Sequence, residues 1–160
     1  MRTHTTPRDA ASSGFTLVEI LVVMVVMAVG LLGGLALVLH GLRASRVALE
    51  QTGAVNLAAD LADRIRANRT AGPAYALGTG TVLPPPAKAC RSAGECDAGD
   101  VAAHDLYEWQ QAALAALPGA RTSVRVAAAD GLAANVYQVR IEWTQAGRST
   151  RANFALTVLA

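Results

Sequence analysis

Gly14-Phe15-Thr16-Leu17-Val18-Glu19 opens the stretch that decides the fold of this chain. After Glu19, the twenty residues from Ile20 to Leu39 carry no charge. A run of this length spans the hydrocarbon core of a bilayer as a single helix. A carboxylate at the start of such a helix is costly, and it is usually functional, with a partner that can be named. The sequence therefore predicts a membrane helix in which Glu19 has a specific role.

The residues before this run are polar. Met1–Ser13 carry Arg2, Arg8 and one acid, Asp9. A secretory signal has its small-residue cleavage site after the apolar core, but the small-residue step Ser12-Ser13-Gly14 lies before the core. Because basic flanks tend to remain in the cytoplasm, we expect a cytoplasmic N-terminus and an exported globular part.

The hexapeptide that ends at Glu19 resembles the type III signal of type IV pilins and their relatives. The resemblance implies that a prepilin peptidase cuts between Gly14 and Phe15 and methylates the new amine of Phe15. Glu19 would then be the fifth residue of the mature chain, and its carboxylate would pair with the Phe15 amine of a neighbouring subunit or of its own chain. An α-amino group with a pKa of about 7.7–8.0 is mostly protonated at neutral pH. The alternative is that Glu19 lies at the headgroup level of the membrane.

The same resemblance implies a division of the chain and a set of partners. Residues 1–14 would be a cytoplasmic leader that is removed, 15–40 the membrane and filament-core half of the helix, and 41–160 a periplasmic globular domain. The expected partners are the prepilin peptidase, the major pilin, other minor pilins and the assembly platform of the inner membrane. No cofactor, metal or nucleic acid is expected. The protein would lie in the inner membrane first and in the pilus later.

The helical pattern continues beyond the apolar run, to about Asn68. Leu57, Leu61 and Ile65 recur at i, i+4 and i+8, which is the spacing of one buried helix face. Alanines at 54, 58 and 62 lie beside them. The alternative is two helices that break near Gly41 or Gly53, because glycine costs about 1 kcal/mol inside a helix.

Two oppositely charged pairs support the helix at this end. Asp60 and Arg64 stand at i, i+4, and Asp63 and Arg66 stand at i, i+3. Each pair contributes about 0.2–0.5 kcal/mol. Many major pilins carry a helix proline about twenty residues after the cut. Here no proline occurs between Pro7 and Pro73, so flexibility would have to come from the glycines between 30 and 41.

Cys90 and Cys96 are the only two cysteines. In an exported domain, two cysteines separated by a short Gly- and Ser-containing loop are expected to form a disulfide. A metal pair is the alternative. It needs further ligands nearby, and only His104 is available, so we reject it.

The segment from Thr70 to Asp100 reads as irregular because it is rich in Gly and Pro. Asp100 offers an N-cap for a helix over 101–117, and Pro118-Gly119 would stop that helix. Its buried side is predicted to hold Leu106, Trp109, Ala113 and Leu117. The irregular segment is either a contact surface for partners, as loops on rigid scaffolds often are, or a tolerated excursion.

The last third of the chain changes to a period of two. Val124 and Val126 begin a strand, and Asp130-Gly131 is a turn signal. The clearest strand follows, with one apolar face. After a turn at 146–149, a last strand carries Phe154, Leu156 and Val158. The apolar face of the second strand consists of Tyr137, Val139, Ile141 and Trp143.

Such a sheet, spanning about 121–159, needs a cover on its apolar face, and the stripe on the long helix can supply it. The predicted fold class is therefore α+β and type IV pilin-like: a long N-terminal helix, a small antiparallel sheet, a disulfide loop and a second short helix. Three further segments resemble the PilV, or type IV pilus modification, group of minor pilins. They are residues 60–68, the cysteine loop followed by Asp105, Trp109 and 117–119, and residues 137–143.

The sequence leaves three functions open. The first is a minor pilin that helps to initiate or cap pilus assembly and so supports adhesion, twitching motility or DNA uptake. The second is a minor pseudopilin of a type II secretion system, which shares the signal and the fold. The third is a membrane-anchored periplasmic enzyme, for which the sequence offers little. His104 and Asp105 are adjacent in the sequence, so they do not face each other on a helix.

The chain has 14 basic and 12 acidic residues. This balance gives no strongly basic surface for nucleic acid.

Overall fold

The computed structural model describes residues 15–88, 90, 95–128, 134–145 and 150–160. The chain divides into two units, residues 1–44 and 45–160. Each unit is described by itself. The leader, the Asp130-Gly131 turn and the turn at 146–149 lie outside the described residues.

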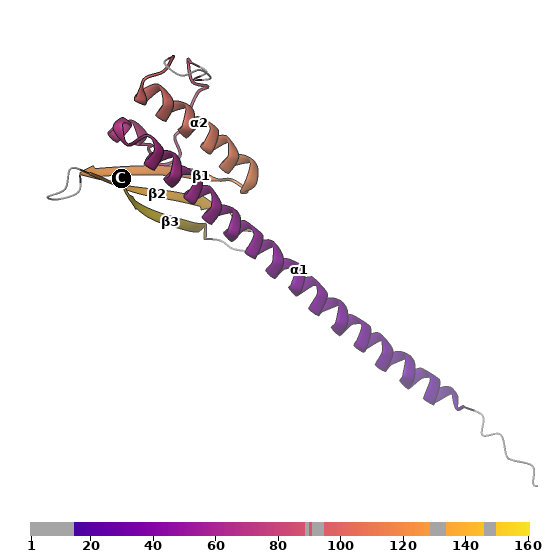
Figure 1. Ribbon diagram of the computed structural model, residues 1–160. Helices are drawn as coiled ribbons and strands as arrows, with labels where there is room; N and C mark the ends of the chain where they lie inside the picture. The colour runs from indigo at the N-terminus through magenta and orange to yellow at the C-terminus, as the bar shows by residue number, and fades with distance from the viewer. Residues whose placement is uncertain (1–14, 89, 91–94, 129–133, 146–149) are drawn as a thin grey trace, which may run out of the picture. The chain divides into compact units, whose positions relative to one another are not determined.

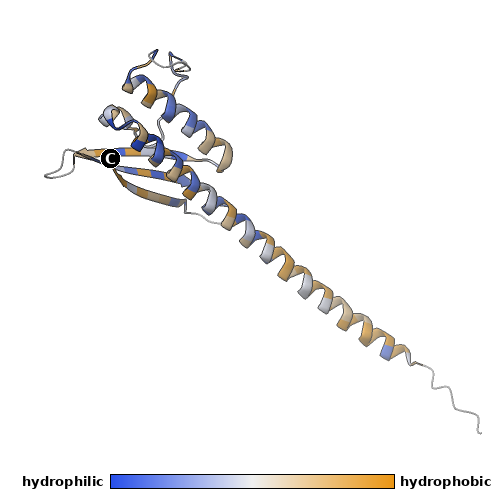
Figure 2. Cartoon of the chain, viewed as in Figure 1, coloured by the Kyte–Doolittle hydropathy of each residue, from blue (hydrophilic) through white to orange (hydrophobic). Residues whose placement is uncertain are grey.

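The helix α1 extends over Leu17–Ala67, and its first part, up to Ala44, belongs to the first unit. Every side chain from Phe15 to Ala44 is exposed, and Figure 2 colours most of this stretch as apolar. The helix is not interrupted at Gly30, Gly41 or Gly53. The expected continuity is therefore confirmed, and the alternative of two helices is wrong.

The second unit contains the rest of α1 and the remaining elements that the structure describes (Figure 1). A short 3₁₀ helix, η1, follows α1, and a second α-helix, α2, precedes three strands. Their bounds are η1 Arg69–Tyr75, α2 Ala98–Ala116, β1 Arg121–Ala128, β2 Asn135–Trp143 and β3 Ala152–Leu159.

The three strands form an antiparallel sheet in the order β1-β2-β3. Val139 of β2 lies opposite Val124 of β1 and Leu156 of β3. The outer edge of β1 is partly covered, because Leu77 forms an isolated bridge with Val124. Residues 70–100 were predicted to be irregular throughout, and this prediction is corrected by η1, by the bridge at Leu77 and by the start of α2 at Ala98. Non-local pairing, which a local pattern does not encode, produces the bridge.

One core holds the unit together. The predicted stripe on α1 is buried at Leu61 and Ile65, with the alanines at 54, 58 and 62, while Leu57 is only half-buried. The whole predicted face of β2 is buried, and Trp109 on α2 is fully buried. α1 and α2 therefore cover the same face of the sheet, and the α+β type IV pilin-like fold is confirmed.

The start of α2 differs from the prediction. Its N-cap is Asp97, three residues before Asp100. The Asp97 carboxylate accepts from the Asp100 N–H at 2.8 Å, and the Asp100 carboxylate accepts from the Asp97 N–H at 3.2 Å. Both acids thus form one capping box. Asp100 was mistaken for the cap because either acid fits the local signal.

Candidate functional site

The first candidate site is the start of α1. Thr16 directly precedes the helix, and its Oγ1 accepts a hydrogen bond from the Glu19 N–H at 3.3 Å. Glu19 is the acidic residue of the first turn. A carboxylate at this position is favoured by the unpaired N–H groups of the helix start. Within the signal, Thr16 and Glu19 therefore also help to form the beginning of the helix.

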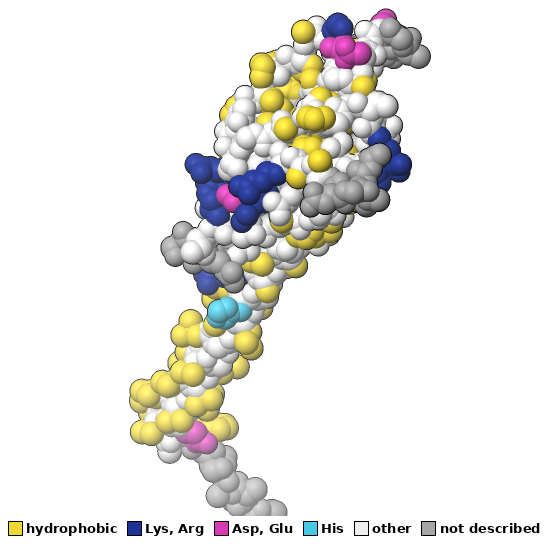
Figure 3. All heavy atoms as spheres, turned by 90° about the vertical axis from the view of Figure 1, so that its left-hand side faces the viewer, with side chains coloured by type: hydrophobic (Ala, Val, Ile, Leu, Met, Phe, Trp, Pro, Cys, Tyr) yellow, Lys and Arg dark blue, Asp and Glu magenta, His cyan; other side chains and the backbone are white. Residues whose placement is uncertain are grey.

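The apolar run after Glu19 has no protein partner in the described residues. It is long and apolar enough to cross a membrane, and none of its most apolar window is buried. Figure 3 shows this stretch covered with yellow apolar atoms, with acidic atoms near its grey end. Among the described residues Glu19 forms no ion pair. Its pairing with the Phe15 amine stays a prediction, and Gly14 lies outside the described residues.

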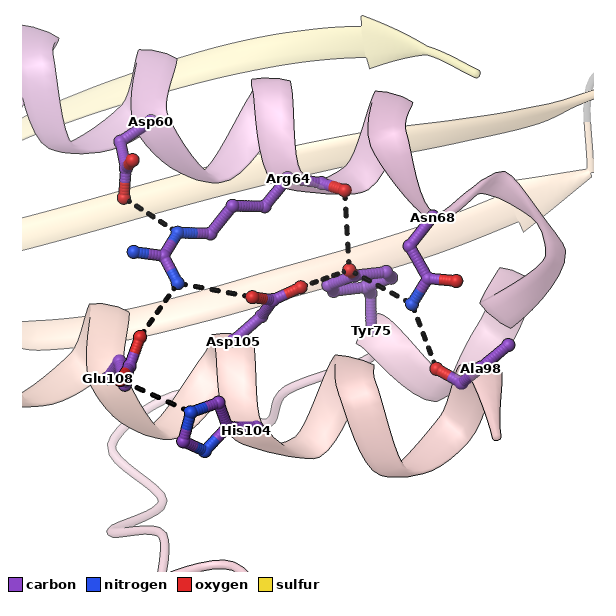
Figure 4. Close-up of polar contacts among 8 residues, drawn as sticks. All are labelled: Asp60, Arg64, Asn68, Tyr75, Ala98, His104, Asp105 and Glu108. Carbon is purple, nitrogen blue, oxygen red and sulfur yellow. Dashed lines mark hydrogen bonds and ion pairs between the residues drawn. The ribbon is translucent and has the colours of Figure 1, made fainter. Parts of the chain in front are cut away.

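The second cluster of polar groups joins α1, η1 and α2 around Arg64 (Figure 4). Arg64 Nε donates to Asp60 at 3.0 Å, which confirms the predicted pair within α1. Its Nη1 also contacts Asp105 and Glu108 of α2, both at 3.1 Å. Burial alone would lower the pKa of Arg64, but the hydrogen bonds to Glu108 and Asp105 raise it. This arginine therefore remains a cation that ties two helices together.

Tyr75 extends the cluster into the core. Its hydroxyl donates to Asp105 Oδ2 at 2.6 Å and lies 3.4 Å from Asn68 Nδ2. Asn68 also donates to the Ala98 carbonyl at 2.9 Å. Burial, and next the bond to Asp105, raise the pKa of Tyr75. Asp105 thus accepts hydrogen bonds from both Tyr75 and Arg64. These three side chains connect α1, η1 and α2.

His104 and Asp105, the residues considered for a periplasmic enzyme, both have partners. His104 Nε2 lies 3.2 Å from Glu108, and Asp105 is engaged as described. In the part of the chain that the structure describes, no group of three His, Cys, Asp or Glu side chains could hold a metal ion. His104 and Asp105 are therefore parts of the helix-joining cluster, that is, the polar cluster around Arg64 that joins α1, η1 and α2.

Cys90 and Cys96 are joined by a disulfide. The bond closes the segment directly before the capping box of α2, with Asp97 as the next residue. The sequence prediction of this pair is thus confirmed.

Four contacts between distant residues of the second unit were not predicted from the sequence. Trp109 Nε1 donates to the Leu57 carbonyl at 2.8 Å, and Trp143 Nε1 donates to Glu50 at 3.1 Å. Arg64 was expected to pair only within its own helix. Because a buried indole N–H needs an acceptor, the two tryptophans indicate that acceptors exist. The sequence does not show which acceptor the fold brings close.

Comparison with known families gives two matches. The prokaryotic N-terminal methylation motif matches residues 9–35. The family described as Tt1218-like, type IV pilin Tt1218, matches residues 36–107. No curated protein and no solved structure matches the chain significantly. The two matches are consecutive, and the second includes Asp60, Arg64, Tyr75 and Asp105. Together with the fold, they support placing this chain in the type IV pilin superfamily.

Proposed function

We propose that this protein is a minor type IV pilin of the PilV group, which is held in the inner membrane and then incorporated into the pilus. The observation that carries the proposal is the methylation motif at residues 9–35, which includes the start of α1, together with the exposed apolar first part of that helix. An apolar helix without a partner in its own chain needs lipid or other helices around it. A membrane before assembly and a helical bundle after it supply these two environments.

Processing is proposed to occur between Gly14 and Phe15, with methylation of Phe15. Replacing Gly14 by Trp should block the cut, whereas Trp at Ala11 in the same leader should not. The mass of the protein purified from its own membranes measures this. A Gly14→Trp protein that still loses fourteen residues would contradict the assignment of the cut.

Glu19 is proposed to neutralise the Phe15 amine within the fibre. A paired charge in a low-dielectric bundle favours one stagger over others, because an unpaired charge there is strongly destabilising. Glu19→Ala should leave membrane insertion intact and sharply lower incorporation into pili, while Glu19→Asp should keep part of it. Quantitative mass spectrometry of membranes and of sheared pili measures both quantities. Equal incorporation of Glu19→Ala and the unaltered protein would refute the pairing.

A role in initiating or capping assembly would distinguish this protein from the major pilin. Residues 15–40 would form the membrane and filament-core segment, and 41–160 the periplasmic domain. Crosslinking of sheared pili, followed by mass spectrometry, should find this chain beside other minor pilins. Its recovery only with components of a type II secretion system would favour the pseudopilin alternative instead.

A further inference from the structure

Charged side chains are distributed unevenly over the second unit. One end of the unit, which we call the basic end, carries four arginines and two carboxylates. The other described residues of the unit carry five basic and seven acidic side chains. The basic end is therefore positive, and the rest of the unit is negative. The residues of the basic end are Arg46, Glu50, Arg121, Arg140, Glu142 and Arg151.

The position of the basic end along α1 is fixed by Trp143, the last residue of β2. Its Nε1 donates to Glu50 at 3.1 Å, so β2 ends beside the beginning of the second unit. The other end of β2 lies near η1, because the Tyr137 hydroxyl donates to the Gly72 carbonyl at 3.4 Å. Arg46 lies about one turn of α1 before Glu50. The basic end is therefore the end of the unit that joins the apolar run.

The strand arginines gather at this same end. Arg121 is the first residue of β1 and lies opposite Glu142. Arg140 Nε contacts Glu142 at 3.1 Å, and both alternate with the buried face of β2, so they lie on the outer face of the sheet. Arg151 Nη1 donates to the Gly119 carbonyl at 2.7 Å. Because a guanidinium has five N–H donors, Arg140 and Arg151 keep donors for a further acceptor.

Three of these cations are not neutralised within the described part of the chain. Arg46, Arg121 and Arg151 are exposed, and none of them forms an ion pair with a described residue. Exposed arginines that lack a carboxylate partner attract anions, and phosphate suits the planar guanidinium. The basic end therefore fits an anionic, phosphate-bearing surface.

The length of α1 between the apolar run and the basic end decides which anionic surface is in reach. From Leu39, the last residue of the run, the rise along the helix is about 10 Å to Arg46 and about 16 Å to Glu50. The headgroup layer occupies about the first 5–8 Å outside the hydrocarbon core. Charges attract each other over a further 8 Å or so at physiological salt. A membrane that contains the run therefore brings its headgroups within the electrostatic reach of the basic end.

We propose that the basic end binds anionic lipid headgroups of the membrane in which α1 is embedded. The phosphates accept charge-assisted hydrogen bonds from Arg46, Arg121 and Arg151. This contact orients the globular unit on the membrane surface before assembly, and it is lost when the subunit is extracted into the fibre. The inference rests on the proposed function, since α1 must hold the chain in a membrane.

Photo-crosslinking of the full chain in vesicles tests the contact. The vesicles consist of phosphatidylcholine with or without phosphatidylglycerol, and a photoreactive phenylalanine analogue replaces Asn153, which is exposed opposite Glu142. The analogue at Leu159, exposed about 20 Å further along the same face of β3, is the position control. Phosphatidylglycerol should raise the yield of lipid crosslinks at Asn153 and not at Leu159. Equal yields with and without phosphatidylglycerol, or crosslinks to protein in place of lipid, would overturn the proposal.

Arg121 and Arg69 offer a matched pair of variants. Both are exposed, and neither forms an ion pair with a described residue, but Arg69 begins η1 at the other end of the unit. Arg121→Gln should lower the phosphatidylglycerol-dependent yield at Asn153 about fivefold, which corresponds to about 1 kcal/mol for one arginine at an anionic surface. Arg69→Gln should leave the yield unchanged, and Arg121→Lys should keep most of it because the charge remains. Equal yields from the two glutamine variants would overturn the proposal.

Two further measurements separate the possible failures. An intact Cys90–Cys96 bond and unchanged protease resistance show that each variant is folded. If the unaltered chain is absent from the cell's membranes and from sheared pili, the proposed function fails. If the chain is present in both and Asn153 gives no crosslink that depends on phosphatidylglycerol, the lipid inference alone fails.

Discussion

Replacing Tyr75 by Phe removes one hydroxyl from the cluster that joins α1, η1 and α2. The Tyr75 side chain is fully buried, and its hydroxyl donates to Asp105 at 2.6 Å. The ring itself contacts Tyr137 edge-to-face, with centroids 6.4 Å apart. Because Phe keeps the ring, the substitution tests the hydroxyl and not the packing.

The expected cost follows from the partner of that hydroxyl. A hydrogen bond to a charged group contributes about 1.5–3 kcal/mol net. Asp105 retains Arg64 at 3.1 Å, and Asn68 retains the Ala98 carbonyl at 2.9 Å, so no charge is left buried without a partner. We therefore expect Tyr75→Phe to lower the free energy of unfolding by about 1.5–3 kcal/mol.

The assay is urea unfolding of the full chain in detergent, followed by tryptophan fluorescence. Both tryptophans, Trp109 and Trp143, are fully buried in the second unit and report on its core. Tyr107→Phe is the matched control, because Tyr107 lies on α2 like Asp105 and its hydroxyl has no hydrogen bond to the described residues. It should change stability by less than about 0.5 kcal/mol. Equal effects of the two substitutions would refute the role of the Tyr75–Asp105 bond.

Three further predictions concern the same unit. The pKa of Tyr75 is raised in the folded state, so the contribution of this group to the free energy of unfolding is complete below the unfolded pKa of about 10 and declines as pH rises above that value. Urea unfolding between pH 8 and 11 should show this decline in stability, and Tyr75→Phe should make the decline smaller. Gln110→Leu should lower the free energy of unfolding by about 1–3 kcal/mol, because it leaves the Thr81 carbonyl and the Leu83 N–H without their side-chain partner. An unchanged urea midpoint would contradict this role of Gln110. Gly119→Ala should cost about 1–2 kcal/mol, because φ is +59° and an added Cβ would lie 3.0 Å from Thr144 Oγ1; a stable variant with an unshifted midpoint would show that this turn tolerates a side chain.

Much of the fold could be predicted because its signals are local and strong. Twenty uncharged residues after Glu19 fix a helix whatever surrounds it, and the alternation from Tyr137 to Trp143 fixes a strand with one buried face. The spacing of Asp60 and Arg64 gave their ion pair. Cys90 and Cys96 had no other cysteine to pair with. In each case the partners are neighbours in the chain or are unique in it.

The tertiary structure decided what depends on distant residues coming together. Arg64 meets Asp105 and Glu108 across more than forty residues, and Leu77 covers the edge of β1 at Val124. No local period encodes these meetings, because they arise only when α1, α2 and the sheet pack around one core. The cap of α2 was misplaced for a related reason, since Asp97 and Asp100 carry the same local signal and only the backbone geometry separates their roles. The sequence alone therefore determined the long helix, the presence of the second helix, the strands and the processing signal, whereas packing determined η1, the bridge at Leu77 and the helix-joining cluster.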